Sequence, residues 1–574
     1  MTFRSILLFA AGALLALAPV SLHAQWQTTT YTLRGGWNAI YLHGDASHTD
    51  IDTLLAAHPG IISIWRWNPN PTQTEFSASP LIPSAGTAEW SVWTRGAPAA
   101  STLFTLSGQT AYLVECSGAA STTYSVPIAQ KALPPRATWV RNGANLLGFP
   151  TFSNAGVFPL FTTYFSTFPV AVSPSSKIFR YNGGPLGPAN PVQIFSPALE
   201  RLDRTRAYWF DSAVVGNFYA PLEITPSNPD GLLFGRSGTL VTVRVRNRTS
   251  APVTLTVAPV PSASAPIGQE PVTGPVPLKR RTFHAPTATH VETPLATGFN
   301  EVIGPQSAIE LNFTPDRALL TGAGNTFYAS LLRFTDSANL IDISLPVSAR
   351  VSSLAGLWVG DVAVTEVTSR APGATGTRSV ARPFPLRVLL HVDNAGVARL
   401  LPQVYLGKLA SAPTTLGLTT LESALLPSAV SDAIRISAAH LPLDVPITAG
   451  SGSVALGATL VRTVTLPFND RTNPFVHAYH PDHDNKDARG NPLPAGVESY
   501  TVTRTCSFTF SPTPVAGADA LGWGTTVLGG TYTESVRGLM SYTDPATNTR
   551  RDDIELSGTF LLRRIDESGS ITLN

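Results

Sequence analysis

The sequence has few charged residues and very few cysteines. Only 13% of its 574 residues are charged, and the net charge is +2. The one tight basic cluster is Lys279-Arg280-Arg281, so the sequence offers no support for nucleic-acid binding. The two cysteines, Cys116 and Cys506, lie far apart in the chain, and large β-domains build their cores without disulfides. We therefore expect two buried free thiols.

Long apolar runs are missing beyond the start of the chain. Residues 6–20 form a short apolar run behind a single arginine, and Ser21-Leu22-His23-Ala24 follow. This pattern is typical of a secretory signal peptide, and we expect cleavage after Ala24. No later run has the ~20 apolar residues of a membrane helix. The mature protein is therefore expected in the periplasm or outside the cell, with no transmembrane segment.

Compact catalytic motifs are missing as well. The sequence contains no G-x-S-x-G, S-x-x-K, P-loop, dinucleotide fingerprint or HExxH motif. Acidic residues such as Glu498 and Glu534 are present, but nothing in the sequence places two of them at the ~5–10 Å spacing that a glycosidase needs. A non-catalytic role is therefore favoured over an enzymatic one.

Glycine and proline are abundant, with 45 and 49 residues, and Ser, Thr and Val recur in short alternating runs. This composition indicates an all-β, multidomain protein. After the signal peptide (1–24), we expect two β-repeat domains (25–125 and 132–222). An immunoglobulin-like β-sandwich (228–352) and a C-terminal β-barrel or β-sandwich domain (355–574) should follow.

The two N-terminal domains are predicted from a repeat. "LRGGWNAIYLHG" (33–44) resembles "VRNGANLLGFP" (140–150), and "IWRWNPNP" (64–71) resembles "IFRYNGGP" (178–185). "AYLVECSG" (111–118) resembles "AYWFDSA" (207–213), and the order is kept. Ser212 replaces Cys116 in the second copy, so this fold does not depend on the thiol. These motifs resemble the GWNL-type β-repeat of uncharacterised secreted bacterial proteins, a resemblance that implies no known chemistry.

The remaining domains are predicted from alternation. Regular short strands around turns such as "NRTSAP" (247–252) indicate a β-sandwich, which resembles an immunoglobulin-like module. In "YTVTRTCSFTF" (500–510) one face is mainly apolar and the other carries Thr and Ser, which indicates a one-sided core. The Gly-x-Trp at Gly356–Trp358 and an arginine on the last strand resemble lipocalin-like barrels, although no ligand is carried over from that resemblance.

The stretch "NPFVHAYHPDHDNKD" (473–487) is the candidate metal site. Calcium would use the oxygen ligands Asp482, Asp484, Asn485 and Asp487. Zinc would use the imidazoles of His477, His480 and His483. Pro481 discourages a helix, and the odd spacing of His477 and His480 places them on opposite faces of a strand, so calcium is favoured over zinc. A hydrogen-bonded turn without any metal is favoured over both ions, and no cofactor is firmly implied.

Six of the ten tryptophans precede residue 94. Trp37, Trp65 and Trp67 have counterparts in the second copy, so we expect them to pack in the core. Trp90 and Trp93 have no clear counterpart, and we expect them at the surface, where they could stack on sugar rings.

The sequence thus predicts an exported, non-catalytic β-protein with a structural, adhesive or binding role at the bacterial envelope or outside the cell. The expected partner is a glycan or an envelope or matrix protein. The alternatives are a carbohydrate-binding protein that uses Trp90 and Trp93, and a metal-dependent protein that uses the 477–487 loop.

Overall fold

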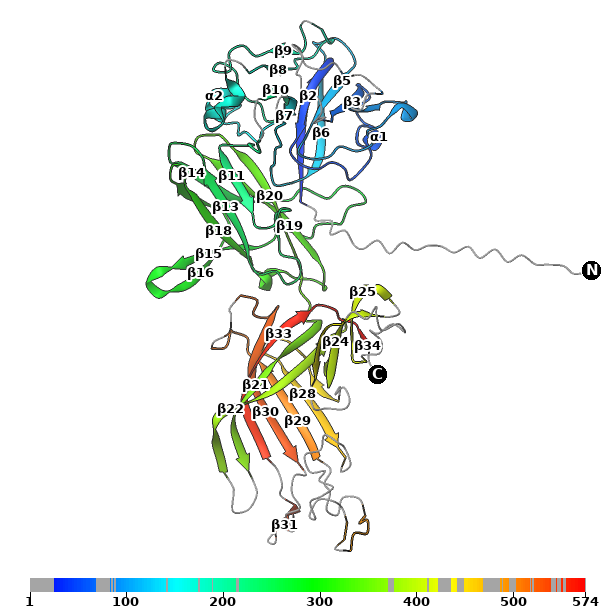
Figure 1. Cartoon of the computed structure of the whole chain (residues 1–574), viewed down its shortest axis with the longest axis vertical. Helices are drawn as coiled ribbons and strands as arrows, with labels where there is room; N and C mark the ends of the chain where they lie inside the picture. Colours follow the sequence, from blue (N-terminus) through cyan, green and yellow to red (C-terminus); the bar gives the residue numbers. More distant parts are fainter. Residues whose placement is uncertain are drawn as a thin grey trace, which may run out of the picture. The chain divides into compact units, whose positions relative to one another are not determined.

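The computed structural model divides the chain into two compact units, residues 1–351 and 352–574 (Figure 1). It describes residues 25–68, 83, 86, 89–140, 143–173, 176–187, 189–212, 216–369, 376–409, 412–421, 435–440, 449–467, 486–487, 489–494, 502–516, 518, 521–537, 543–544, 549–550 and 554–572. Within these residues the α-helices are two single turns, α1 (Ile51–Leu54) and α2 (Phe161–Tyr164), so the protein is all-β and multidomain as expected. No helix among the described residues has the length and apolar character needed to cross a bilayer.

The first repeat is built on a four-stranded antiparallel sheet with the order β2-β5-β3-β4. Its strands are β2 (Gly36–Leu42), β3 (Ile61–Trp67), β4 (Trp90–Thr94) and β5 (Thr110–Cys116). A ribbon of β1 (Trp26–Arg34) and β6 (Thr123–Lys131) packs with α1 on one face, against side chains such as Ile40 and Val114. Because successive side chains of a strand alternate, Ala39 and Leu113 point to the other face.

The second repeat forms a sheet with the equivalent order, β7-β10-β8-β9. Its strands are β7 (Gly143–Leu147), β8 (Ile178–Arg180), β9 (Val192–Gln193) and β10 (Tyr208–Ser212). Asn38 pairs with Val114 in the first copy, and Asn145 pairs with Phe210 in the second. These are the positions that the repeated motifs align. The two copies therefore share strand order and register.

Two five-stranded sheets form the β-sandwich that the alternating pattern predicts. The first is β11 (Leu222–Pro226), β13 (Val241–Asn247), β18 (Ala308–Pro315), β15 (Leu278–His284) and β16 (Thr289–Pro294). The second is β12 (Leu232–Leu233), β20 (Asp342–Arg350), β19 (Phe327–Asp336), β14 (Val253–Pro261) and β17 (Phe299–Ile303). Val243, Leu255 and Phe334 are fully buried in their common core. That core continues into Trp139 and Phe210, so the sandwich and the second repeat share one hydrophobic cluster.

The second unit is dominated by an eight-stranded sheet with the order β23-β22-β21-β33-β30-β29-β28-β27. Its strands are β21 (Gly356–Ser369), β22 (Gly376–Val392), β23 (Ala398–Leu400), β27 (Gly450–Gly452), β28 (Thr459–Leu466), β29 (Val502–Phe510), β30 (Val527–Arg537) and β33 (Ile554–Asp566). The buried Arg462 of β28 donates through Nε and Nη2 to the carbonyl oxygen of Ala398 in β23, at 3.0 and 2.8 Å. This contact joins strands near opposite ends of the sheet order, which closes the sheet toward a barrel around Phe508, Phe510 and Phe560.

A four-stranded sheet, β26-β24-β25-β34, accompanies the large sheet. Its strands are β24 (Gln403–Leu409), β25 (Ala412–Thr419), β26 (Arg435–His440) and β34 (Ile571–Thr572). Leu357 and Leu389 of the large sheet form a cluster with Val404 and Leu418, while the neighbouring Trp358 and Leu390 belong to the aromatic core. The two faces of β21 and β22 therefore serve two different cores.

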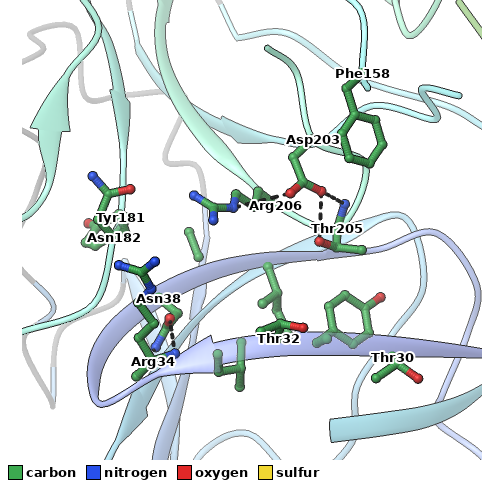
Figure 2. A pocket seen from close by; sticks show the side chains of 14 residues that line it. Thr30, Thr32, Arg34, Asn38, Phe158, Tyr181, Asn182, Asp203, Thr205 and Arg206 are labelled. Carbon is green, nitrogen blue, oxygen red and sulfur yellow. Dashed lines mark hydrogen bonds and ion pairs between the residues drawn. The ribbon is translucent and has the colours of Figure 1, made fainter. Parts of the chain in front are cut away.

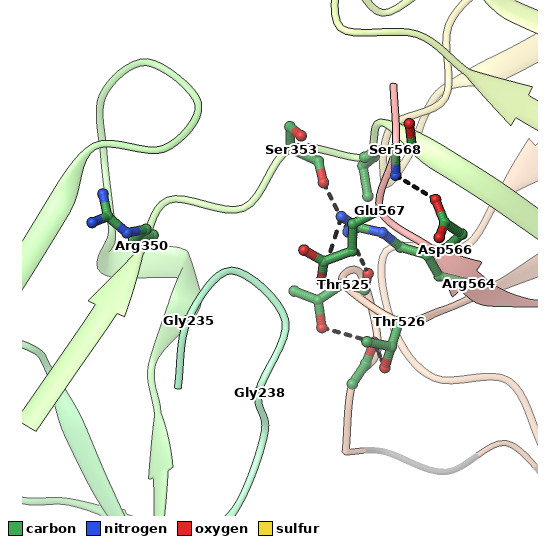
Figure 3. A network of polar contacts seen from close by, with 12 residues as sticks. Gly235, Gly238, Arg350, Ser353, Thr525, Thr526, Arg564, Asp566, Glu567 and Ser568 are labelled. Carbon is green, nitrogen blue, oxygen red and sulfur yellow. Dashed lines mark hydrogen bonds and ion pairs between the residues drawn. The ribbon is translucent and has the colours of Figure 1, made fainter. Parts of the chain in front are cut away.

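The Gly-x-Trp motif and the arginine of the last long strand meet in one contact. Figure 3 shows the polar contacts of this arginine, Arg564, with Ser353 and Thr525. The guanidinium carbon of Arg564 in β33 lies 5.8 Å from the ring centroid of Trp358 in β21. Its Nη1 donates to the carbonyl oxygens of Ser353 and Thr525 at 2.9 and 3.1 Å. The Arg564 side chain is only 2% exposed, and Glu567 lies 3.7 Å from its Nη2. Trp358 and Arg564, which lie far apart in the sequence, thus form one buried contact.

Both cysteines are buried free thiols, as expected. Burial raises the pKa of Cys116 and of Cys506 to about 12. Because the thiolate is the reactive form, both side chains act as small apolar groups in their cores at neutral pH.

Replacing Arg564 with alanine should lower the free energy of unfolding of the full chain by about 2–4 kcal/mol, because two partly buried carbonyls lose their donor and the buried packing of the side chain is lost. Urea unfolding of the full-length protein measures the change. Arg387→Ala is the control, because the Arg387–Asp361 pair is 53% and 47% exposed and such pairs contribute ~0–1 kcal/mol. Equal losses of unfolding free energy in the two variants would contradict the interpretation that burial makes the Arg564 contacts stabilising.

Candidate functional site in the N-terminal repeats

A cluster of aromatic side chains fills the space between the sheets of the two repeats. Trp90 and Trp209 are buried in it, and Trp37, Trp65 and Trp67 are partly buried against it. Ring centroids of Trp67 lie 5.2 Å from Trp90 and 5.4 Å from Trp209, both edge to face. Such pairs stabilise by about 0.5–1.5 kcal/mol each beyond burial. The packing role expected for Trp37, Trp65 and Trp67 is confirmed.

The surface position expected for Trp90 and Trp93 is wrong. Trp90 is 4% exposed and Trp93 is 2% exposed. They are three residues apart in β4, so they point to opposite faces: Trp90 toward the second repeat, and Trp93 into the core beneath α1, where its Nε1 donates to Asp52 at 3.1 Å. Two indoles on opposite faces cannot form one platform for a sugar ring.

The register also supplies the counterparts that the sequence comparison missed. Arg66 pairs with Ser91 in the first copy, and Arg180 pairs with Val192 in the second. Trp90 therefore corresponds to Pro191 and Trp93 to Ile194, which is itself 5% exposed. Both tryptophans thus occupy positions that are built into the repeat, one at each face of its sheet.

One asparagine in each repeat holds the strand to the preceding turn. Asn38 Oδ1 accepts from the Arg34 N–H at 2.9 Å, and Asn38 Nδ2 donates to the Arg34 carbonyl at 2.7 Å. In the second copy Asn145 makes the same two bonds to Val140, at 2.7 and 3.0 Å. The asparagine side chain thereby replaces a missing pair of strand hydrogen bonds.

The outer edge of β2 is bonded to loops of the second repeat. Trp37 N–H donates to the Gly184 carbonyl at 2.9 Å, and Tyr41 N–H donates to the Thr205 carbonyl at 3.1 Å. Gly36 has φ +85°, and a Cβ there would overlap the Gly184 carbonyl, so this approach requires glycine. Between these two bonds, strand alternation also directs the Ala39 N–H away from β5.

A cavity of about 290 Å³ lies along this edge of β2 (Figure 2). We call it the β2 cleft. Thr30–Arg34 of β1 and Asn38–Ile40 of β2 line it from the first repeat, and Phe158, Tyr181, Asn182, Asp203, Thr205 and Arg206 line it from the second. The site is therefore shared by both copies, and its lining is mostly polar.

The charged groups of the β2 cleft are partly organised. Asp203 Oδ1 accepts from the backbone N–H and the hydroxyl of Thr205, at 2.8 and 2.9 Å. Arg206 Nε lies 3.4 Å from Asp203 Oδ2. Arg34 is exposed at the end of β1, and no hydrogen bond or ion pair to its guanidinium is found among the described residues. Tyr181 is neutral, because burial raises its pKa to about 12, and its hydroxyl accepts from Trp209 Nε1 at 3.1 Å.

A second cavity, of about 300 Å³, occupies the equivalent place along β7. We call it the β7 cleft. Asn145, Leu146 and Leu147 correspond to Asn38, Ala39 and Ile40, while Trp67, Asn68, Gln109 and Thr110 correspond to Tyr181, Asn182, Thr205 and Arg206. The duplication therefore produces two related clefts, with different side chains at their rims.

Burial raises the pKa of tyrosine and cysteine side chains in this fold, which disfavours the deprotonated form that acts as a nucleophile. Each described tyrosine or cysteine with a shifted pKa has it raised, with desolvation as the main cause, as for Tyr31, Tyr41 and Cys506. His43 is buried, and desolvation holds its pKa well below the usual value. These groups stay neutral and serve as hydrogen-bonding partners within the fold.

Of the candidate metal ligands, Asp487 is the one that lies among the described residues. Asp487 Oδ1 accepts from the N–H groups of Arg489 and Asn491, both at 2.8 Å, and its Oδ2 accepts from Asn491 Nδ2 at 2.9 Å. These bonds lower the pKa of its carboxyl and form a turn over residues 487–491, at the end of the predicted segment. The other candidates lie outside the described residues: His477, His480, Asp482, His483, Asp484 and Asn485. The described part of the chain shows no group of three or more His, Cys, Asp or Glu side chains arranged for a metal.

No known protein family and no curated protein matches the sequence. Among solved structures, a PapD-like domain of human CEP192 matches 23% of this chain and 85% of its own, with 9% identity and a TM-score of 0.14. A DUF4466 family protein from Parabacteroides merdae matches 60% of this chain and 99% of its own, with 10% identity and a TM-score of 0.14. At such TM-scores neither similarity carries an argument about this chain, and the resemblance to GWNL-type repeats stays a prediction.

For the 477–487 segment we expect calcium, and not zinc, to raise the melting temperature of the full chain, because a ligand of the folded state alone stabilises it by mass action. Thermal unfolding with calcium, with zinc and with a chelator is the measurement. A shift with zinc alone that is lost in His477→Ala or His480→Ala would reverse this order. No shift with either ion would leave the turn without a metal.

Proposed function

We propose that the protein is an exported, non-catalytic β-protein that binds a saccharide in the β2 cleft between its N-terminal repeats. The observation that carries the proposal is the cleft itself, to which both repeats contribute polar side chains over a strand edge. The further β-domains would present this module at the bacterial envelope or outside the cell. The proposed sugar site is therefore the β2 cleft between the two repeats, in place of Trp90 and Trp93.

The chemistry of the cleft suits a ligand rich in hydroxyl groups. Thr30, Thr32 and Asn182 supply hydroxyl and amide groups that both donate and accept hydrogen bonds. Asp203 accepts, and the Ala39 N–H donates from the strand edge. A cavity of about 290 Å³ lies near the lower end of small-molecule sites, which span ~300–1,000 Å³. It therefore suits one sugar unit of a chain better than an extended polymer.

The rim of the cleft can vary without loss of the fold. The β7 cleft keeps the same strand register and the same asparagine, but Thr110 stands where the β2 cleft has Arg206. The Asp203–Arg206 pair of the β2 cleft is therefore not demanded by the architecture of the repeat. Polar groups that the fold does not require are the ones available for a ligand.

Export is supported at the start of the described chain. Gln25, the first described residue, is buried, and its Nε2 donates to the Val347 carbonyl at 3.0 Å. The next residue, Trp26, is 2% exposed and packs with Phe327 of the β-sandwich. A signal peptidase cut after Ala24 would leave this anchor complete.

We expect mature protein from the periplasm or the medium to begin at Gln25, as judged by N-terminal peptide mass spectrometry. A cut two or more residues later would remove the Gln25–Val347 bond and the Trp26 packing, so it should not be found in folded protein. Protein that keeps residues 1–24 in every fraction would contradict export with cleavage.

Thr32→Trp tests the saccharide site. Thr32 is exposed on β1 and lines the cleft, so an indole there fills the cavity without disturbing the core. We expect glycan binding by the full chain, found on an array and measured by calorimetry, to weaken at least tenfold, about 1.4 kcal/mol.

Thr28→Trp is the matched control, because Thr28 is also exposed on β1 but does not line the cleft. It should bind as the wild type does. If no saccharide binds, or if both variants bind equally well, the proposal fails and a purely structural or adhesive role through protein contacts is favoured.

A further inference from the structure

The backbone of Arg34 is held by hydrogen bonds, and its guanidinium has no hydrogen-bond or ion-pair partner among the described residues. Asn38 bonds both its backbone N–H and its carbonyl. A Cβ at Gly183 would lie 2.6 Å from the Arg34 Cβ, so the stem of the side chain packs directly on that glycine. The guanidinium points into the β2 cleft region beside Asn182 (Figure 2). The fold thus fixes the backbone and the stem of Arg34, while the guanidinium has no partner among the described residues.

Neighbouring arginines are engaged by the fold. Arg206 faces Asp203, Arg180 is paired with Glu200, and Arg204 reaches Asp342. The lining of the β2 cleft therefore contains two guanidiniums and one carboxylate, Arg34 and Arg206 against Asp203, a net charge of +1. An uncompensated positive charge at a partly enclosed site attracts an anion more strongly than the same charge in open water.

We propose that the saccharide bound in the β2 cleft is acidic and that its carboxylate is held by the Arg34 guanidinium. This inference rests on the proposed saccharide site and names its ligand class. A guanidinium presents N–H donors in a planar fork that matches the two oxygens of a carboxylate. A uronic acid places that carboxylate on a ring whose hydroxyls can donate to Asp203 and to the Thr205 hydroxyl oxygen, and can accept from Asn182.

The β7 cleft serves as a control within the same molecule. Its arginine, Arg66, donates through Nε to Asn68 Oδ1 at 3.2 Å, so this side chain is engaged within its own repeat. Thr110 stands at the position of Arg206. Arg66 corresponds to Arg180 of the second repeat, whereas the repeat counterpart of Arg34 is Arg141, which lies outside the described residues. Among the described lining residues, the β2 cleft combines an arginine without a described partner with the Asp203–Arg206 pair, and the β7 cleft does not. Selectivity for acidic sugars should therefore depend on Arg34 and be independent of Arg66.

The test is binding of the full chain to sugars presented in matched pairs that differ only at the acidic carbon: glucuronate with glucose, galacturonate with galactose, and mannuronate with mannose. At least one acidic member should bind tenfold or more tightly than its neutral partner. The preference should shrink as salt rises from low to high ionic strength, because screening weakens an exposed charge pair.

Variants assign the preference to one side chain. Arg34→Gln should abolish the acidic preference, and Arg34→Lys should keep part of it, because lysine retains the charge but lacks the fork. Arg66→Gln should leave it unchanged. Circular dichroism and the melting temperature check that each variant is folded, as expected for substitution of an exposed side chain.

The outcomes separate this inference from the proposed function. Equal binding of acidic and neutral sugars, with loss of both in Thr32→Trp, would overturn the acidic ligand and keep the saccharide site. A preference that survives Arg34→Gln would overturn the role of Arg34. Tighter binding of a 6-sulfated sugar than of the matching uronate would overturn the carboxylate assignment. Binding of no pair at all would overturn the saccharide site itself.

Discussion

The packing of the two repeat sheets around a shared tryptophan cluster is the constraint on which the N-terminal unit depends. Trp67, Trp90 and Trp209 meet edge to face there, from strands of both copies. Each sheet presents a broad apolar surface on this face, and exposing that surface to water would be unfavourable. Burying both faces against each other also brings β2 against the loops that contain Gly184 and Thr205. The β2 cleft exists only because this packing sets the distance between the copies.

Duplication explains why the molecule has two similar clefts with different rims. Strand order, register and the turn asparagine are the same in both copies, and a one-residue shift of register would reverse which side chains face the core. Rim positions carry no such constraint, and Arg206 in one cleft corresponds to Thr110 in the other. The repeated part of the structure is therefore the scaffold, and the part that differs is where a ligand would be distinguished.

Much of the fold follows from local sequence, whereas the candidate site does not. Alternation and repeated motifs predict the all-β architecture, but they do not indicate that Trp358 contacts Arg564. The burial of Trp90 and Trp93 was missed because β4 has little sequence signal of its own, although their odd spacing already excluded a shared face. The β2 cleft joins Arg34 to Asp203 and Arg206, and only packing between the copies places such distant residues together.

The rigidity of this scaffold bears directly on recognition. The backbone at Arg34 is fixed by Asn38, and the adjoining turn is fixed by the close approach of Gly36 to Gly184. Asp203 is oriented by the N–H and hydroxyl of Thr205 before any ligand arrives. Binding would then order little beyond the Arg34 side chain, at a cost of roughly 0.5–1.5 kcal/mol for one flexible group. One charge-assisted hydrogen bond contributes ~1.5–3 kcal/mol, and the β2 cleft presents a guanidinium that has no partner among the described residues, so selectivity between an acid and its neutral analogue would come from this one group.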